Sequence, residues 1–345
     1  MEFSRKVQVT GAGDTRIISL PKDWAERHQL TKGSNIVIKE LSTGDLIIYP
    51  QKSPIPSKRI SNIIESDHVS RDVLGAYLLG SDIIAVRSPD IKQPLTHKAS
   101  IKELSRQLVG LEILGETQKS IELHFLIDSS SLPNPTEYVN RCFSIANQMQ
   151  SDAINAFLEG DVSLAVEVIE RDVEVNRLYF LIVRMLKIMV NDKREMSYLK
   201  STACLDWRMI ASYSEDLGDA SVEFARVVKN YPKMKDALSS DTLSKINRLS
   251  ELTTDVLNQS LVCFFEQNGQ GAEQLKGRIR RQLSGIHEEI EREISRLAKE
   301  DVWKLTYLLN FLRDLRETAI DIGDLVHESD ANEPENFTRM DISTP

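Results

Sequence analysis

The sequence predicts a multidomain protein: a small β domain at the N-terminus, a small α/β segment in the middle and an all-α domain at the C-terminus. Residues 1–52 hold several short strand patterns, and residues 57–130 mix strand and helix patterns. From residue 135 to 328, apolar side chains recur every three to four positions, as on helices. We expect domain boundaries at these points and a disordered tail over residues 329–345.

The composition is that of an ordinary soluble globular protein, with 41% hydrophobic and 28% charged residues. No apolar run reaches the roughly 18 residues of a membrane span, so we expect no membrane insertion. Residues 1–6 lack the apolar core of a signal peptide. Cys142, Cys204 and Cys263 form no CxxC pair and are expected to be buried thiols. These features predict a cytoplasmic protein.

The net charge of −9 is distributed unevenly along the chain. Residues 1–52 hold 8 basic and 6 acidic side chains, whereas the remainder holds 35 basic and 46 acidic ones. The acidic part is therefore a poor candidate for nucleic-acid binding, while the N-terminal part is a possible one.

The N-terminal domain is predicted from short strands separated by turns. Pro21 is a natural first residue of a helix. The expected elements are strands at 3–9 and 16–20, a helix at 22–29, and a hairpin of strands 35–40 and 46–49. A unit of this size buries little core by itself, which indicates that it needs a partner.

This N-terminal pattern resembles a known DNA-binding domain. The run Ile18-Ser19-Leu20-Pro21-Lys22, followed by Leu30, Lys32-Gly33 and a hairpin, is similar to the AbrB/SpoVT/MazE swapped-hairpin domain, although Ser34 stands where an acidic residue is usual. The resemblance implies that two chains interlace into a homodimer and bind DNA through a basic face. The candidate phosphate-contacting residues are Arg5, Lys6, Arg16 and Lys22. Alternatively, these are solvated charges on a module that only dimerises.

The middle segment is predicted to be a small α/β unit. It follows a proline-rich linker at 51–58, and its expected elements are helices at 69–79 and 100–108 and strands at 83–86, 111–116 and 120–126. The alternation over 121–125 is typical of a half-buried edge strand. His97 and His124 fit no catalytic pattern and are expected to be surface or structural residues.

The C-terminal domain is predicted to hold six helices. After a second linker at 129–135, they are expected at 138–157, 163–190, 196–228, 240–267, 272–297 and 301–328, with Ser240 or Asp241 capping the fourth. They fall into two halves, 135–231 and 240–328, which we interpret as two antiparallel three-helix bundles.

A repeated acidic stretch supports this division. Residues 215–219, Glu-Asp-Leu-Gly-Asp, are echoed 105 positions later by Asp-Ile-Gly-Asp at 321–324. Glu215 and Asp219 share a helix face, where like charges are unfavourable, and a glycine inside a helix costs about 1 kcal/mol. A metal ion, or close packing at the glycine, would explain both features. Alternatively, the acids form a solvated bundle surface.

Six helices in two halves that carry this motif resemble the PhoU family of phosphate-uptake regulators. The companion stretch of that family matches residues 170–176, and the resemblance implies a metal site formed by Asp172, Asn176, Glu215 and Asp219. These oxygen ligands suit a hard divalent cation or iron. The second half departs from the pattern, since Ile320 replaces the glutamate and the position matching Asp172 is Gly277, beside Arg278, Arg280 and Arg281. We expect Arg–Asp pairing there.

The two resemblances together imply a phosphate-homeostasis regulator that binds DNA and responds to the phosphate ABC transporter ATPase, in an archaeal-type fusion. A second hypothesis is a scaffold that dimerises and modulates the ATPase without binding DNA. A third is a metal-carboxylate enzyme, but the Glu-x-x-His motif of di-iron bundles is missing near the acids. His287-Glu288 also lacks the second histidine of a zincin. We therefore expect no enzymatic activity.

Overall fold

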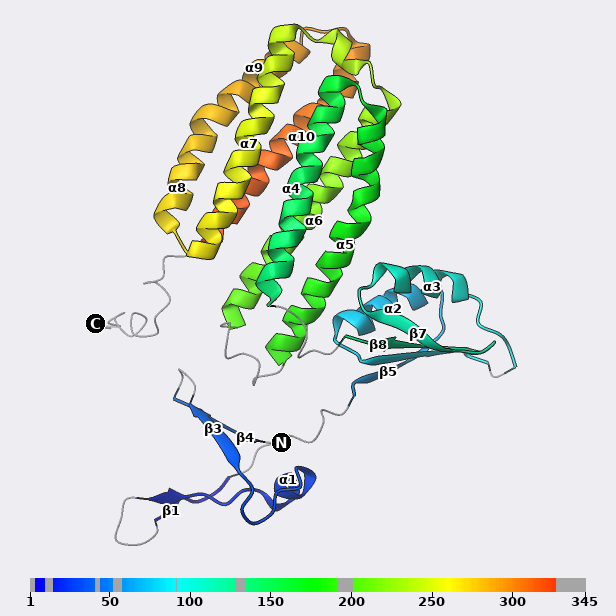
Figure 1. The fold of residues 1–345 in the computed structure, drawn as a ribbon, viewed down its shortest axis with the longest axis vertical. Coiled ribbons are helices and arrows are strands. Elements are labelled where there is room, and N and C mark those ends of the chain that lie inside the picture. The colour runs from blue at the N-terminus through cyan, green and yellow to red at the C-terminus, as the bar shows by residue number, and fades with distance from the viewer. Residues whose placement is uncertain are drawn as a thin grey trace, which may run out of the picture. The chain divides into compact units, whose positions relative to one another are not determined.

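A computed structural model shows a chain that divides into two compact units, residues 1–58 and 59–345 (Figure 1). The structure describes residues 4–9, 15–40, 44–51, 58–90, 92–127, 134–191 and 201–326. Most of the two predicted linkers and the whole predicted tail at 329–345 lie outside these ranges.

The first unit contains the predicted strands and helix. Strands β1 and β2 pair antiparallel, as do β3 and β4, and the register of the second pair places Ile38 opposite Ile48. The elements are β1 (Gln8–Val9), β2 (Arg16–Ile17), α1 (Lys22–Arg27), β3 (Ile36–Glu40) and β4 (Leu46–Pro50). Strand β1 is shorter than expected.

Apolar side chains of the first unit lie exposed in a single copy of the chain. Val9, Ile38 and Leu46 are 66%, 57% and 60% exposed. Among the residues described in this unit, Pro50 alone is buried. The unit therefore lacks a core of its own, as its size predicted.

The second unit begins with a four-stranded sheet in the order β5-β6-β8-β7. Strands β5 (Ile60–Ile64) and β6 (Ile83–Arg87) are parallel, whereas β8 (Ser120–Phe125) runs antiparallel to β6 and to β7 (Leu111–Glu116). Helices α2 (Val69–Leu78) and α3 (Lys98–Gln107) cover one face (Figure 1).

Two expectations for this sheet were wrong. Strand β5 was not predicted, because its short run of Ile-Ser-Asn-Ile-Ile directly follows the proline-rich linker. Strand β8 lies between β6 and β7 rather than at the edge. Its alternation arises because one face of the sheet is covered by helices, and this pattern carries no information about a strand's lateral position.

The remainder of the second unit is helical, and it forms two groups that share one apolar core. Helices α4 (Pro135–Glu159), α5 (Val162–Asn191) and α6 (Ser201–Asn230) form the first group (Figure 1). The second group comprises α7 (Ser240–Glu266), α8 (Gly269–Arg278), α9 (Ser284–Ile294) and α10 (Lys299–Asp324). Phe224 and Phe311 stack across the two groups with ring centres 4.9 Å apart. The cap of α7 is Ser239, rather than Ser240 or Asp241.

The predicted fifth helix is divided by a π-helical turn at Ile279–Leu283. Leu275, Ile279 and Leu283 are spaced by four residues and all three are buried. In an α-helix of 3.6 residues per turn, side chains four positions apart point in gradually different directions around the helix axis. The wider π-helical turn brings these three side chains back to the face that packs on the core. This explains why two α-helices replace the single one predicted at 272–297.

A buried arginine joins the sheet layer to helix α5. Arg184 is 1% exposed, and its Nη1 donates to the carbonyl oxygens of Tyr77 at 2.6 Å and Ser81 at 3.1 Å. Its guanidinium lies 3.8 Å from the ring centre of Phe125. Burial of a charge is tolerated only when it is paired or hydrogen-bonded, so these contacts fix the α/β segment on the helices.

Within the part of the chain that the structure describes, none of the helices combines the length and the apolar character that crossing a bilayer requires.

Candidate functional site

The four predicted metal ligands come together between two neighbouring helices. Asp172 and Asn176 are one turn apart on α5, and Glu215 and Asp219 are one turn apart on α6. The helices approach closely at Gly218, where an added Cβ would lie 3.3 Å from the Val175 side chain. Close packing at the glycine is thus present, together with the clustering of acids.

Burial and mutual repulsion both act on the carboxyls of this acidic site. Burial raises the pKa of Asp172 and the Asp219 charge raises it further, whereas Arg226 partly offsets both. Burial likewise raises the pKa of Glu215, and Asp219 and Asp172 add to the shift. The Asp219 charge therefore disfavours the ionised forms of Asp172 and Glu215, so a bound proton or cation would stabilise the cluster.

One oxygen in the site lacks a partner. The Asp172 Oδ2 atom accepts a hydrogen bond from Asn176 Nδ2 at 2.8 Å, but its Oδ1 atom is buried without any hydrogen bond. A buried carboxylate oxygen without a donor fits a cation ligand. The described residues nevertheless include no three carboxylate, imidazole or thiolate groups that enclose a metal ion as they stand.

In the second half, a lysine side chain packs against the glycine that matches Gly218. Gly323 matches Gly218, and a Cβ added there would meet the Lys276 side chain at 3.3 Å. The Lys276 ammonium forms an ion pair with Asp324. The expected Arg–Asp pairing is present, but it joins Arg278 to Asp255 at 2.9 Å rather than to Asp324.

Sequence reasoning assigned no role to two further α6 residues near the acids. Tyr213 lies near both acidic stretches: burial raises the pKa of its hydroxyl, and Asp321 and Asp216 raise it further. Arg208 Nη2 donates to the Tyr179 hydroxyl. The repeat gave a signal for Arg208, because Arg313 occupies its place in the second half.

The predicted DNA-contacting residues all lie in the first unit and are exposed. Arg16 is on β2, and Lys22 opens α1, where its ammonium is 3.7 Å from Glu26. Arg5 and Lys6 precede β1. Their contact with DNA stays a prediction.

Comparison with known families identifies the helical region. Residues 139–228 match the family described as "PhoU domain". Over these residues the chain is similar to a PhoU domain. This PhoU match covers the first three helices and includes all four residues of the acidic site. Residues 12–56 match "Antidote-toxin recognition MazE, bacterial antitoxin", which confirms the second resemblance.

Solved PhoU structures resemble this chain at low sequence identity. The PhoU crystal structure from Pseudomonas aeruginosa shares 17% identity at a TM-score of 0.48, covering 56% of this chain and 93% of that one. The phosphate transport system regulatory protein PhoU from Streptococcus pneumoniae shares 15% at 0.45, covering 56% and 91%. No curated protein matches the chain.

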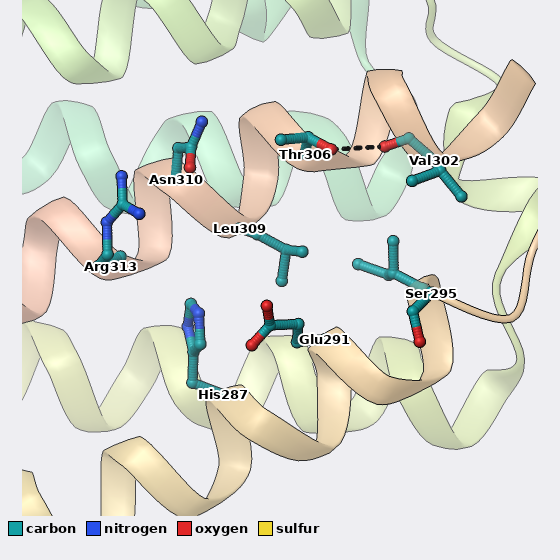
Figure 2. Close-up of a pocket in the computed structure, with 9 residues that line it drawn as sticks. His287, Glu291, Ser295, Val302, Thr306, Leu309, Asn310 and Arg313 are labelled. Carbon is teal, nitrogen blue, oxygen red and sulfur yellow. Dashed lines mark hydrogen bonds between the residues drawn. The ribbon is translucent and has the colours of Figure 1, made fainter. Parts of the chain in front are cut away.

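A polar groove lies beyond the PhoU match, between α9 and α10. Figure 2 shows His287 and Glu291 projecting from α9 towards α10, where Leu309 points back at them. Burial lowers the pKa of His287, and the nearby Arg316 and Arg313 lower it further, against the opposing effect of Glu291. The folded protein therefore holds this imidazole in its neutral form.

We expect His287 to make the protein less stable in mild acid. Because its pKa is lower in the folded state, the unfolded chain binds more protons below the ordinary value of 6.5, and stability falls as the pH drops through that range. The His287→Gln variant lacks this contribution, so its melting temperature relative to the wild type should rise as the pH falls from about 7.5 to 5.5, a range that spans imidazole titration. The exposed His68→Gln variant is the control, and equal profiles for both would contradict this assignment.

Proposed function

We propose that this protein is a phosphate-uptake regulator that couples the state of phosphate transport to transcription. The observation that carries the proposal is the joining of a MazE-like domain and a PhoU domain in one chain. In this proposal the PhoU domain receives the signal through the phosphate transporter ATPase, and the N-terminal domain delivers the output by binding DNA.

The exposed apolar side chains of the first unit support a homodimer. Its exposed apolar side chains, such as Val9 and Leu46, would be buried against a second copy. Dimerisation would also double the number of basic side chains available to DNA phosphates, which matters because one copy of residues 1–52 has only a small basic excess.

A divalent cation or iron is the proposed cofactor of the acidic site. Asp172, Asn176, Glu215 and Asp219 would hold it through oxygen atoms, and the unpartnered Oδ1 of Asp172 supports this choice. The cation would supply positive charge between α5 and α6. The protein's own side chains set the affinity, because their repulsion is relieved on binding.

The test of the proposal is an electrophoretic mobility shift of DNA from upstream of phosphate-transport genes, with the full chain. Binding should weaken log-linearly as salt rises from about 50 to 200 mM, because phosphate contacts release counterions. Replacing Arg5, Lys6, Arg16 and Lys22 with alanine should abolish the shift. Replacing the exposed Arg27 and Lys32 is the matched control and should change it less.

A scaffold without DNA binding is the second candidate, and the small basic excess of the first unit favours it. A dimer that gives no shift at low salt but binds the transporter ATPase would establish the scaffold and reject the transcriptional role. A shift of equal strength for the quadruple variant would reject the assigned DNA contacts.

A further inference from the structure

A histidine and a glutamate meet at one edge of the sheet in the α/β segment. Glu65 directly follows strand β5, and its backbone N–H donates to the carbonyl of Arg87, the last residue of β6. His97 occupies the N-cap position of α3. The Glu65 side chain is only 5% exposed, whereas that of His97 is 36% exposed. The pair therefore lies at the carboxyl ends of two parallel strands, which is where α/β sheets commonly bind ligands.

Glu65 is held as a carboxylate. Its Oε1 atom accepts hydrogen bonds from the backbone N–H groups of Thr96 at 2.8 Å and His97 at 2.7 Å, and from the Thr96 hydroxyl at 3.2 Å. Burial raises the pKa of Glu65, but these hydrogen bonds and one from the His97 ring outweigh that effect and hold the pKa below its usual value. An ionised carboxylate has no proton to donate, so every polar group that bonds to Oε1 must be a donor.

These contacts fix which nitrogen of the His97 ring carries the proton. Nδ1 lies 3.2 Å from Glu65 Oε1 and 3.0 Å from the Thr96 hydroxyl oxygen. Because the Thr96 hydroxyl donates its one proton to Glu65, both oxygens present lone pairs to Nδ1. Nδ1 therefore carries the proton, and Nε2 carries the lone pair of the neutral ring. Nε2 has no hydrogen-bond partner among the described residues and is not buried, so it is open to an incoming group.

His124 is also paired with a glutamate, but through its other ring nitrogen. Its Nε2 atom lies 2.5 Å from Glu122 Oε1, and its side chain is 18% exposed. A hydrogen bond donated by Nε2 to Glu122 leaves the lone pair of the neutral ring on Nδ1. The sheet thus contains two glutamate-paired histidines of opposite geometry, which provide an internal comparison.

The surroundings of His97 favour a negatively charged reactant. The positive end of the helix dipole and the first N–H groups of α3, which lack intrahelical partners, lie beside it. The first turn of α3 contains no acidic residue and begins with Lys98, whose ammonium also pairs with Glu116 at 3.5 Å. A nucleophilic nitrogen that a carboxylate orients, at a position that attracts anions, is suited to accept a phosphoryl group.

We propose that His97 is a phosphoryl-acceptor site, in which Nε2 is the modified atom and Glu65 is the positioning residue. The donor belongs to the phosphoramidate or acyl-phosphate class. The Nε2 lone pair attacks phosphorus and forms a P–N bond, while the donor's leaving group departs with the electron pair of the broken bond. The ring keeps its Nδ1 proton and becomes positively charged, and Glu65 stabilises that charge. The site lies apart from the acidic site and from the predicted DNA contacts, so the inference goes beyond the proposed function and does not depend on it.

Treatment of the full chain with phosphoramidate, without DNA or added metal, tests the site. The probe transfers its phosphoryl group and releases ammonia. His97 should be labelled at least roughly tenfold faster than the exposed His68, the low end of what an orienting carboxylate contributes. Peptide mapping at alkaline pH identifies the labelled residue, and phosphorus NMR distinguishes the two ring isomers. The product at His97 should be the Nε2 isomer, whereas any product at His124 should be the Nδ1 isomer.

Glu65→Gln should slow the labelling of His97 roughly tenfold, because an amide stabilises the cationic product less than a carboxylate does. Glu122→Gln alters the partner of His124 in the same way, and this matched control should leave the His97 rate unchanged. Labelling of His97 at Nδ1, or no faster than at His68, would overturn the proposal, and neither result depends on a variant that folds. An unchanged rate in a folded Glu65→Gln variant would contradict the positioning role of Glu65.

Discussion

Replacing Asp172 with asparagine should stabilise the metal-free protein and remove its response to divalent cations. The substitution deletes one of several mutually repelling charges and keeps the shape of the side chain. With a cation at about 100 times its dissociation constant, the wild type should gain about 2.7 kcal/mol, and the variant should gain little. Thermal unfolding in a chelator and in excess Mn²⁺ or Mg²⁺ measures both effects.

The pH dependence of the metal-free protein supplies an independent check. Because the pKa values of Asp172 and Glu215 are higher in the folded state, that state binds more protons than the unfolded chain. In a chelator, these two carboxyls should therefore contribute increasing stability as the pH falls from about 7 towards 5, opposite to the contribution of His287, and the melting temperature of Asp172→Asn relative to the wild type should fall over that range. Glu170→Gln, on the exposed face of α5, is the control. A lower melting temperature of Asp172→Asn in chelator, with the cation response retained, would reject the site.

Replacing Arg184 with alanine should cause the largest loss of stability. The change removes the Arg184 donor of the Ser81 carbonyl and one of two donors of the Tyr77 carbonyl, which keeps the N–H of Gly80, and a buried polar group left unpaired costs about 1–3 kcal/mol. A cavity beside Phe125 adds to the loss. Together we expect several kcal/mol, measured by denaturant unfolding.

The same experiment shows whether the sheet layer then unfolds separately. Arg184→Ala should broaden or split the transition, because the variant weakens the attachment of the α/β segment to α5. Arg177→Ala removes an exposed arginine from the same helix and should stay within about 0.5 kcal/mol of the wild type. Equal losses for both variants would contradict the anchoring role of Arg184.

Much of the fold could be predicted because apolar spacing specifies helices directly. That Glu215 and Asp219 share a helix face could be predicted for the same reason, since they are one turn apart, and Asp219 recurs in the repeat as Asp324. The Lys276–Asp324 ion pair could not be predicted from the sequence. It joins two helices, and how they are aligned along each other depends on tertiary packing. Arg184 did leave a signal: it stands inside the apolar run Leu181–Leu186, where an isolated charge requires a buried partner.

Lys276 makes the acidic stretches of the two helical halves electrostatically unequal. Its ammonium is covalently part of the chain, so Asp324 has a counter-charge at every ion concentration, whereas Arg226 only partly offsets burial and repulsion at Asp172. With the proposed cation, we expect the first half to respond to the ion while the second half keeps its internal counter-charge. A titration of one protomer with that cation should then follow a simple hyperbola, because a single binding site has no second site with which its occupancy could be coupled.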